Sequence, residues 1–457
     1  MRLIIKLLFL LTIAVAVYYL LFHYQLNQEP TYITSEKCQS CHQENYQSWK
    51  ENTLHPYMFR PLKSEDEILG DFESGDPDVT FSKSDVQYIF GNKWEQMYVK
   101  MIDGEYYPLP AKWHIMLKKW EPYKVDSWHK TKMSYKCNGC HTTGFDPNTL
   151  KFSEFGIGCE ACHGPGSLHQ QNEMKRHDIG CSICHMDDQP TAKHETTDII
   201  RSVSPSVCGQ CHNRGTNTDK EAVREGKFNF SLNFSPDGDV TPLINPSTPK
   251  NDKKGKYWWG NGISKNRHQE FSDWGKSKHA KAHTLLVENY KKDGDRGELK
   301  DECLQCHSTE YRNAPADAKP DLDHVRFGIT CITCHEPHGH DKKKSTFGDG
   351  SAVCSQCHIA SMGKISGEKG RPHIPCPATA VSCADCHMPK VVKTGGFFSL
   401  RSHAFRIIPP DETLKTGSPN SCQNGGCHDN KSIEWAQDAF KSHYPDFKDS
   451  LTEQQTP

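Results

Sequence analysis

The sequence has few apolar residues and almost no net charge. Only 35% of its 457 residues are hydrophobic, and the formal net charge at pH 7 is -2. A chain with so little apolar surface cannot easily build an ordinary hydrophobic core of its own. The charge balance also gives no reason to expect binding to nucleic acid, which favours an excess of Lys and Arg. The length is sufficient for two or three domains.

Long hydrophobic runs are missing except at the start of the chain. Two basic residues precede or flank a mostly apolar run that extends from Leu7 to Phe22. Such a run is either a cleaved signal peptide or an uncleaved anchor. Apolar residues continue past the small residues that end at Ala16, and the run approaches the roughly 20 residues that span a bilayer. We therefore predict an N-terminal transmembrane helix over residues 1–23, with its positive end inside and the body of the protein exported.

Cysteine, in contrast, is abundant and follows one pattern. The 21 cysteines include ten pairs, and a histidine follows the second cysteine of every pair directly. Nine pairs have the spacing C-x-x-C-H, and the tenth has the wider spacing C-x4-C-H. In chain order the ten sets are Cys38, Cys41 and His42; Cys137, Cys140 and His141; Cys159, Cys162 and His163; Cys181, Cys184 and His185; Cys208, Cys211 and His212; Cys303, Cys306 and His307; Cys331, Cys334 and His335; Cys354, Cys357 and His358; Cys383, Cys386 and His387; and Cys422, Cys427 and His428.

The C-x-x-C-H pattern is the attachment signature of a c-type haem. The thiols add to the haem vinyl groups as thioethers, and the histidine becomes the proximal iron ligand. Zinc sites and disulfide frameworks also use closely spaced cysteines, but neither requires a histidine directly after the second one. We therefore expect ten covalently attached haem c groups, nine through C-x-x-C-H and one through C-x4-C-H. In the wide set Gly425-Gly426 can bulge without strain, and a local disulfide is the alternative there.

Ten haems change the expected fold, because each is a large apolar plate on which side chains can pack. We predict a mostly irregular and α chain with few short helices, wrapped around a haem stack that serves as the core. Long loops should connect the helices, unlike in an average globular domain. The apoprotein should be largely unfolded, as in other chains whose folding is coupled to cofactor binding.

One cysteine-free stretch departs from this picture. Residues 60–126 contain β-prone runs on either side of Asp103-Gly104, a pair typical of a tight hairpin. We predict a small β insert here, packed on the first haems.

The remaining composition divides the chain into parts. Residues 213–262 are rich in Asn, Asp, Ser, Pro and Gly and read as a connector between five motifs on either side. The predicted parts are the anchor at 1–23, an N-terminal pentahaem half at 24–212, the connector, a C-terminal pentahaem half at 263–445, and a polar tail at 446–457.

Two further patterns concern the halves. Trp49 and His55 near the start are echoed by Trp274 and His279, which suggests a duplication. Ile433–His443 has helical spacing, with its apolar residues on one face.

Several strings are more specific than a bare haem motif. Over roughly residues 35–440 the chain resembles the large multihaem c-type cytochromes with paired C-x-x-C-H motifs. The strings that carry the resemblance are Tyr88-x-Phe90-Gly91-x-Lys93-Trp94-x-Gln96-x-Tyr98, Cys137 to Gly144, Cys159 to His169, Cys334-His335-x-Pro337-His338, Cys386-His387-Met388-Pro389 and Arg401-Ser402-His403-x-Phe405. The resemblance implies an exported electron-transfer protein with stacked bis-histidine haems, and some relatives act on small nitrogen or sulfur species. The set at Cys181 looks like an added haem, and Cys376 has no place in the pattern.

Function depends on the sixth position of each iron. A second histidine there gives a haem that passes electrons, whereas an open position allows a substrate to bind. The 26 histidines are enough to fill all ten positions after the proximal ones are counted. On the resemblance, the preferred distal ligands are His55, His129, His169, His279, His338 and His403, followed by His268, His283, His324 and His373. The added haem would take His177 or His194, while His114 and His340 are expected to be surface residues or partners of haem propionates.

Two functions from different classes remain. The first is a membrane-anchored conduit that carries electrons along a chain of bis-histidine haems. The second is a multihaem oxidoreductase for nitrite, hydroxylamine or a sulfur oxyanion at one open haem. No motif carries lysine in place of the proximal histidine, so the lysine-ligated nitrite reductases are not matched, and we favour an electron carrier over a catalyst.

The conduit has further implications. Its location would be extracytoplasmic, in the periplasm or at the cell surface, with the anchor in the cytoplasmic membrane. Its partners would be a redox-protein or quinol-oxidising donor and a downstream acceptor, and subunits could join into a homo-oligomer or filament. Nucleic acid is not an expected partner.

Overall fold

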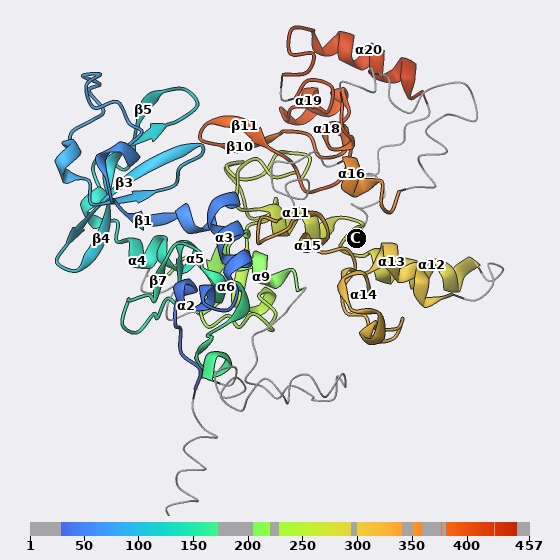
Figure 1. The fold of residues 1–457 in the computed structure, drawn as a ribbon. Coiled ribbons are helices and arrows are strands. Elements are labelled where there is room, and N and C mark those ends of the chain that lie inside the picture. The colour runs from blue at the N-terminus through green and yellow to red at the C-terminus, as the bar shows by residue number, and fades with distance from the viewer. Residues whose placement is uncertain are drawn as a thin grey trace, which may run out of the picture.

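The computed structural model describes residues 29–171, 204–219, 228–293, 299–340, 351–358, 376, 381–424 and 426–445. The helices in these ranges are short, with at most 12 residues, and long irregular segments connect them (Figure 1). This confirms the prediction of short helices and long loops. None of the helices within these ranges is both long and apolar enough to cross a membrane. The predicted anchor and polar tail lie outside the described residues.

The predicted β insert is present as one five-stranded antiparallel sheet. Its strands lie side by side in chain order, so each strand pairs with the next along the sequence. The turn between the third and fourth strands contains Asp103 and Gly104, whose φ angles of 50° and 76° suit a tight hairpin turn. The strands are β1 (Phe59–Pro61), β2 (Tyr88–Phe90), β3 (Glu95–Ile102), β4 (Glu105–His114) and β5 (Lys119–Pro122), with short 3-10 turns η2 (Glu65–Glu67) and η3 (Lys83–Asp85) between β1 and β2.

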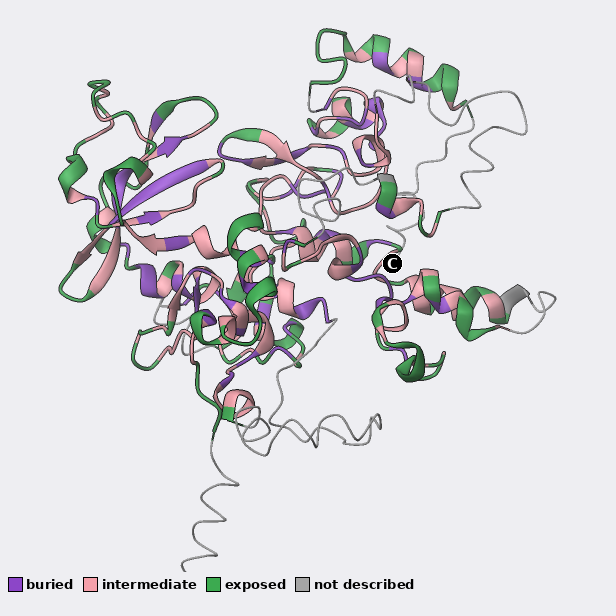
Figure 2. Cartoon of the chain, in the orientation of Figure 1, coloured by how far each residue is buried: buried purple, intermediate pink, exposed green. Residues whose placement is uncertain are grey.

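The insert has an apolar core of its own, which the haem-centred expectation did not include. Aromatic rings meet edge to face in it, and the buried strands appear purple in Figure 2. The buried hydroxyl of Tyr98 donates to Gln96 Oε1 at 2.8 Å and accepts the backbone N–H of Gly70 at 2.8 Å, so burying it leaves no orphaned polar group. The core residues are Val86, Tyr98, Leu109, Ala111, Trp113 and Trp120.

The first cysteine motifs lie on short helices beside this sheet. In Figure 1 they form the blue and green region below and to the right of it. The elements are α2 (Ser35–Gln39), α3 (Gln43–Asn52), η1 (His55–Tyr57), η4 (Trp128–Lys130), α4 (Met133–Lys136), α5 (Asn138–His141), β6 (Thr142–Thr143), β7 (Glu154–Phe155), α6 (Cys159–His163) and α9 (Ser206–Gly209).

The second part of the chain has the same character. A small apolar cluster of Ile263, Val391, Val392 and Ile408 brings the end of the predicted connector onto the last motifs. The predicted helix near the end is present and buries Ala436 and Phe440. The elements are β8 (Gly215–Asn217), η5 (Thr241–Leu243), β9 (Ile244–Pro246), α11 (Glu270–Lys276), α12 (Ala282–Asp293), η6 (Asp301–Cys303), α13 (Leu304–His307), α14 (Thr309–Asn313), η7 (Ala316–Ala318), α15 (Cys331–Cys334), α16 (Ser351–Cys354), α18 (Cys383–His387), β10 (Val392–Thr394), β11 (Phe397–Leu400), α19 (Pro410–Thr416) and α20 (Ile433–His443).

The insert also contacts the C-terminal part of the chain, through His114. This side chain is only 1% exposed, and its Nε2 contacts the carbonyl oxygen of Gly395 in the turn between β10 and β11. Nearby, Arg267 forms an ion pair with Glu95 at 3.2 Å. Of the two expectations for His114, the surface position was therefore wrong, because a hairpin distant in sequence covers this residue, and the propionate partner stays a prediction. His340 is exposed, as expected, with Nε2 at 2.7 Å from Asn45 Oδ1.

We predict that Gly104→Ala will lower the free energy of unfolding by about 1–2 kcal/mol, because an L side chain is strained at this positive φ. A methyl group there would meet no other atom, so the cost would be conformational only. Gly275→Ala is the matched control, since this helical glycine also has open space around it and should gain up to about 1 kcal/mol. Denaturant titration of both holoproteins measures the difference. Equal effects at the two positions would contradict this account of the hairpin.

Candidate haem and iron-ligand sites

A single helical turn presents the groups of the narrow motifs in the described part of the chain. The histidine N–H donates to the carbonyl oxygen of the first cysteine in several motifs, for example His42 to Cys38 at 2.8 Å and His335 to Cys331 at 2.9 Å. Residues three and four positions apart lie on one face of a helix. Both thiols and the imidazole therefore lie on the same side, which is the arrangement that covalent attachment above a proximal ligand requires.

The wide motif achieves its spacing with a braced loop. Gly426 has φ 92°, a conformation that favours glycine, as predicted for the bulge. The amide side chain of Asn420 accepts the N–H of Cys422 at 2.9 Å, and Gln423 donates to the carbonyl of Lys431 at 2.7 Å. These bonds hold the loop in place between the two thiols.

None of the cysteines in the described part of the chain forms a disulfide, so the motif cysteines could all form thioether bonds. Thiols of different motifs also contact one another. Cys38 lies against Cys159, Cys140 against Cys211, Cys208 against Cys331, and Cys306 against Cys357. Because a thioether would sit on the rim of a haem, motifs whose thiols lie close to each other would hold their haems close together. The Cys208–Cys331 contact joins the two predicted halves.

Five proximal rings face a histidine from outside their own motif across a nearly constant gap. The ring centres are 6.3 Å apart for His42 and His169, 5.9 Å for His163 and His338, 6.1 Å for His335 and His403, 6.0 Å for His358 and His279, and 6.4 Å for His141 and His268.

This gap has the size that an iron between two imidazoles requires. An imidazole nitrogen binds a first-row metal at about 2 Å, and the ring centre lies about 1 Å behind the nitrogen, so the centres of opposed rings should be about 6 Å apart. Aromatic rings in direct contact also have centres about 4.5–7 Å apart, so the assignment rests on the recurrence of this gap between the proximal histidine of a motif and a histidine from outside it. The free thiols and the spaced imidazoles together fit c-type haem, and the axial pairs they define are our assignment.

The Trp–His echo corresponds to repeated backbone contacts. The indole N–H of Trp49 donates to the carbonyl of Ile157 at 3.2 Å, and that of Trp274 donates to the carbonyl of Ile329 at 2.8 Å. The N–H groups of these isoleucines donate in turn to the carbonyls of His55 and His279, at 3.0 and 2.9 Å. Each isoleucine lies two residues before a motif, so the two contacts hold equivalent histidines beside equivalent haems.

His55 and His268 both lie near His212, and the repeated Trp–His contacts indicate which proximal histidine each of them faces. His268 lies 6.4 Å from the rings of both His141 and His212. Burial and then the neighbouring His212 lower the pKa of His55 to about 4. Since His279 faces His358, the repeat favours His55 opposite His212 and leaves His268 for His141.

The structure does not bring the other described candidates onto a proximal ring. His129 is exposed against Trp128, with ring centres 5.9 Å apart. His283 Nε2 lies 3.1 Å from the carbonyl oxygen of Leu322, and the exposed His324 lies with Nδ1 at 2.6 Å from Asp321. The set at Cys181, Cys184 and His185, together with His177, His194 and His373, lies outside the described residues.

The second ring nitrogens have different partners, which sequence reasoning missed. His212 Nδ1 lies 3.3 Å from Glu270 Oε2. The other oxygen of this carboxylate accepts the backbone N–H of His268 at 3.2 Å. The neighbouring Glu270 carboxylate raises the pKa of His212 to about 9. In contrast, Nδ1 of His141 and Nδ1 of His335 are buried and make no hydrogen bond. A partner at this nitrogen changes how strongly the imidazole donates to a metal.

Two further residues near the motifs were also not identified as important from the sequence. The buried carboxylate of Glu160 accepts the N–H groups of Ile33, Thr34 and Gly166 at 3.0, 2.8 and 2.7 Å, which ties α6 to the start of the described chain. Cys376 lies near Cys427, since burial and then Cys427 raise its pKa. The odd cysteine therefore belongs to the surroundings of the wide motif.

Comparisons with known proteins agree with this chemistry. The family model "Cytochrome c554 and c-prime" matches residues 37–82, 112–164 and 265–336, and the model "Doubled CXXCH motif" matches residues 324–363. No curated protein matches the chain. The matched segments contain the motifs that begin at Cys38, Cys137, Cys159, Cys303, Cys331 and Cys354.

Two solved structures are similar. The crystal structure of the outer cell wall cytochrome OcwA is 26% identical, covers 91% of this chain and 87% of its own, and has a TM-score of 0.73. The undecahaem cytochrome from the S-layer of Carboxydothermus ferrireducens is 18% identical, covers 90% of this chain and 59% of its own, and has a TM-score of 0.48. The first match extends the likeness beyond the motif-bearing segments to most of the chain.

We predict that Glu270→Gln will raise the reduction potential of one haem by about 60 mV, the equivalent of one charge-assisted hydrogen bond of about 1.4 kcal/mol for a one-electron couple. The carboxylate behind His212 makes the imidazole a stronger donor and stabilises ferric iron, whereas an amide does so less. Spectroelectrochemical titration of the holoprotein would measure the shift. The control is Glu302→Gln, an exposed carboxylate beside Cys303. An unchanged titration curve in Glu270→Gln would show that this contact does not tune a haem.

Proposed function

We propose that this multihaem c-type cytochrome is an exported conduit that carries electrons along a chain of bis-histidine haems. The observation that carries the proposal is the set of opposed imidazole pairs with ring centres about 6 Å apart. Bound c-type haem supplies a reversible one-electron couple. With both axial positions filled by the chain, the iron keeps the same ligands in both oxidation states, which suits electron transfer and leaves no position for a substrate.

The thiol contacts support a continuous path. The Cys38 and Cys159 motifs meet, the Cys159 and Cys208 motifs are neighbours, and Cys208 contacts Cys331 in the second half. Cys386 and Cys422 are also neighbours, which brings together the last two motifs. Haems held at these positions would lie rim to rim, so electrons would move between adjacent haems without crossing long stretches of protein.

The number of haems and their location complete the proposal. We infer ten haems, including one held by Cys422 and Cys427 and one by the set at Cys181. Covalent haem on this pattern indicates an extracytoplasmic protein, and the likeness to an outer cell wall cytochrome supports the cell-surface side of that choice. Residues 1–23 would anchor the chain in the cytoplasmic membrane, near a redox-protein or quinol-oxidising donor. The acceptor would lie further out, with other copies of the chain in an oligomer or filament as one extension of the path.

The surroundings of His428 favour the alternative function, that of a multihaem oxidoreductase. His428 is exposed, and its ring neighbour in the described part of the chain is Trp435 at 4.9 Å rather than an imidazole. An iron held by His428 could therefore keep a face open to a small inorganic substrate. If the protein is an oxidoreductase, its active haem would be the one held by His428.

We predict low-spin haems in the untreated protein and one new high-spin ferric signal in His169→Ala. The imidazole of His169 faces His42, and its removal would open that iron. Electron paramagnetic resonance of the oxidised holoprotein measures this. His340→Ala is the control, because the exposed His340 contacts Asn45 and not a proximal ring. A stoichiometric high-spin haem in the unmodified protein that binds nitrite or hydroxylamine would replace the conduit by the oxidoreductase.

We predict an intact mass equal to that of the chain plus ten haems, and the same haem count in Cys376→Ser. Cys376 lies near Cys427, so a disulfide between these two residues would remove one thiol that the wide motif needs for haem attachment. Mass spectrometry of the denatured holoprotein separates the cases. Nine haems with a mass loss of two hydrogens would mean that the wide motif is oxidised and holds no haem.

A further inference from the structure

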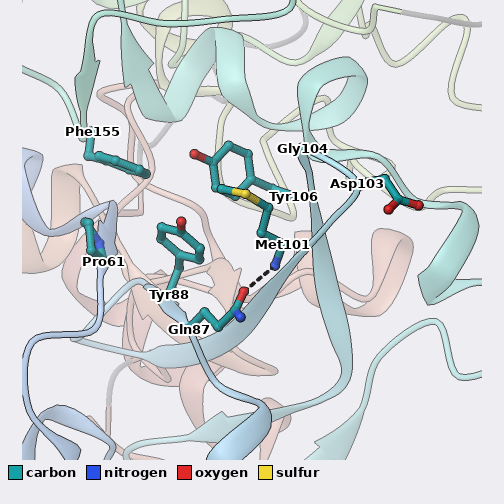
Figure 3. A pocket seen from close by; sticks show the side chains of 8 residues that line it. All are labelled: Pro61, Gln87, Tyr88, Met101, Asp103, Gly104, Tyr106 and Phe155. Carbon is teal, nitrogen blue, oxygen red and sulfur yellow. Dashed lines mark hydrogen bonds between the residues drawn. The ribbon is translucent and has the colours of Figure 1, made fainter.

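The β insert carries an aromatic-lined pocket that the proposed conduit does not use (Figure 3). Its volume is about 590 Å³, within the usual range for small-molecule sites. It opens beside the Asp103-Gly104 turn, and the rings of Tyr88 and Tyr106 extend into it in Figure 3. The lining side chains are Pro61, Tyr88, Met101, Tyr106 and Phe155.

The lining has features of a site for a flat ring. Tyr88 stacks on Phe155 with ring centres 5.6 Å apart and meets Tyr106 edge to face at 5.0 Å. Aromatic walls of this kind favour planar aromatic ligands by stacking and edge contacts. The Gln87 side chain accepts the Met101 N–H through its oxygen at 2.8 Å, so its amide group is oriented at the wall of the pocket.

The polar groups narrow the ligand class further. The hydroxyls of Tyr88 and Tyr106 hydrogen-bond to each other, so one of these O–H groups and the amide of Gln87 remain as donors. These donors suit a ring that carries carbonyl oxygens. Asp103 is the acidic group of the lining, which disfavours an anionic ligand. The lining contains neither histidine nor cysteine, so it offers no metal site or nucleophile.

Behind the pocket an unbroken aromatic cluster leads to a haem motif. The buried Phe59 contacts Tyr106 and Phe155 at 5.2 and 5.1 Å on the pocket side. On its other side Phe59 contacts Phe90 at 5.8 Å, and the Phe90 ring lies 4.4 Å from that of His141. Cys137 of the same motif packs on this cluster. A ligand in the pocket is therefore separated from this haem position by packed rings and not by water.

We propose that this pocket binds a neutral quinone, through which the haem chain exchanges electrons with a diffusible carrier. The proposal rests on the proposed function, because the electrons come from the haems. Bound haem would supply the two electrons, as two ferrous irons become ferric, and these electrons would reduce the quinone in the pocket. The quinone takes two protons from water at the open mouth and leaves as the hydroquinone.

The first experiment measures binding without turnover. Menadione is titrated into the oxidised holoprotein, and the dissociation constant is obtained by equilibrium dialysis. We expect Tyr106→Leu to weaken binding about tenfold, because an aromatic wall is lost. Met101→Trp, which fills the pocket from its rim, should also weaken binding. Tyr107→Leu is the matched control, since the neighbouring position on β4 points to the other face of the sheet. A sulfonated naphthoquinone should bind more weakly than menadione because of Asp103.

The second experiment separates this proposal from the conduit itself. Fully reduced holoprotein is oxidised by menadione or by ferricyanide in a stopped-flow instrument. We expect the menadione rate to fall in Tyr106→Leu and Met101→Trp while the ferricyanide rate stays the same. Slow oxidation by both would indicate a failure of the haem chain and not of the pocket.

Two results would overturn the quinone site. One is equal menadione affinity in Met101→Trp, Tyr106→Leu and Tyr107→Leu, which would mean that the quinone binds elsewhere. The other is absence of menadione binding together with binding of a polyproline peptide that Met101→Trp abolishes, since aromatic grooves also accept such peptides.

Discussion

The constraint on which the rest of the structure depends is the distance of about 6 Å between the ring centres of paired histidines. Opposed rings with centres about 6 Å apart leave room for an iron between their nitrogens, and short elements of the chain hold them at this spacing. The partners come from distant parts of the chain, as in His163 with His338 and His42 with His169. In the proposed conduit each axial pair would act as a cross-link through iron. These links and the haems between them would hold together a chain with few apolar residues.

The covalent motifs and the axial pairs have different physical origins, and this decides what the sequence could predict. A C-x-x-C-H motif is one helical turn, so its chemistry can be read from adjacent residues. The hairpin at Asp103-Gly104 and the helix at Ile433–His443 are local in the same sense, and both predictions were confirmed. The repeated Trp–His pattern could be seen from the sequence only as an echo, because its meaning lies in bonds to isoleucines before a later motif.

Long-range contacts explain what could not be predicted. His114 was expected at the surface or beside a haem propionate, but the hairpin that contains Gly395 covers it. Glu270 carries no signature that would distinguish it from other acidic residues, and its importance arises because folding places it behind His212. The same holds for Cys376, which only the folded chain brings to Cys427. Each of these residues acquires its role from a partner that no local pattern indicates.

The chain-order pairing of the insert strands has a kinetic consequence. Every strand of this sheet pairs with its sequence neighbour, and its core closes without a haem ligand. Contacts between near neighbours form faster than those that close long loops. The proposed axial pairs belong to the second class, because they join residues far apart in the sequence, such as His163 and His338. The sheet can therefore fold before the haems are in place, and it provides a preformed surface against which the later, slower assembly of the cytochrome is ordered.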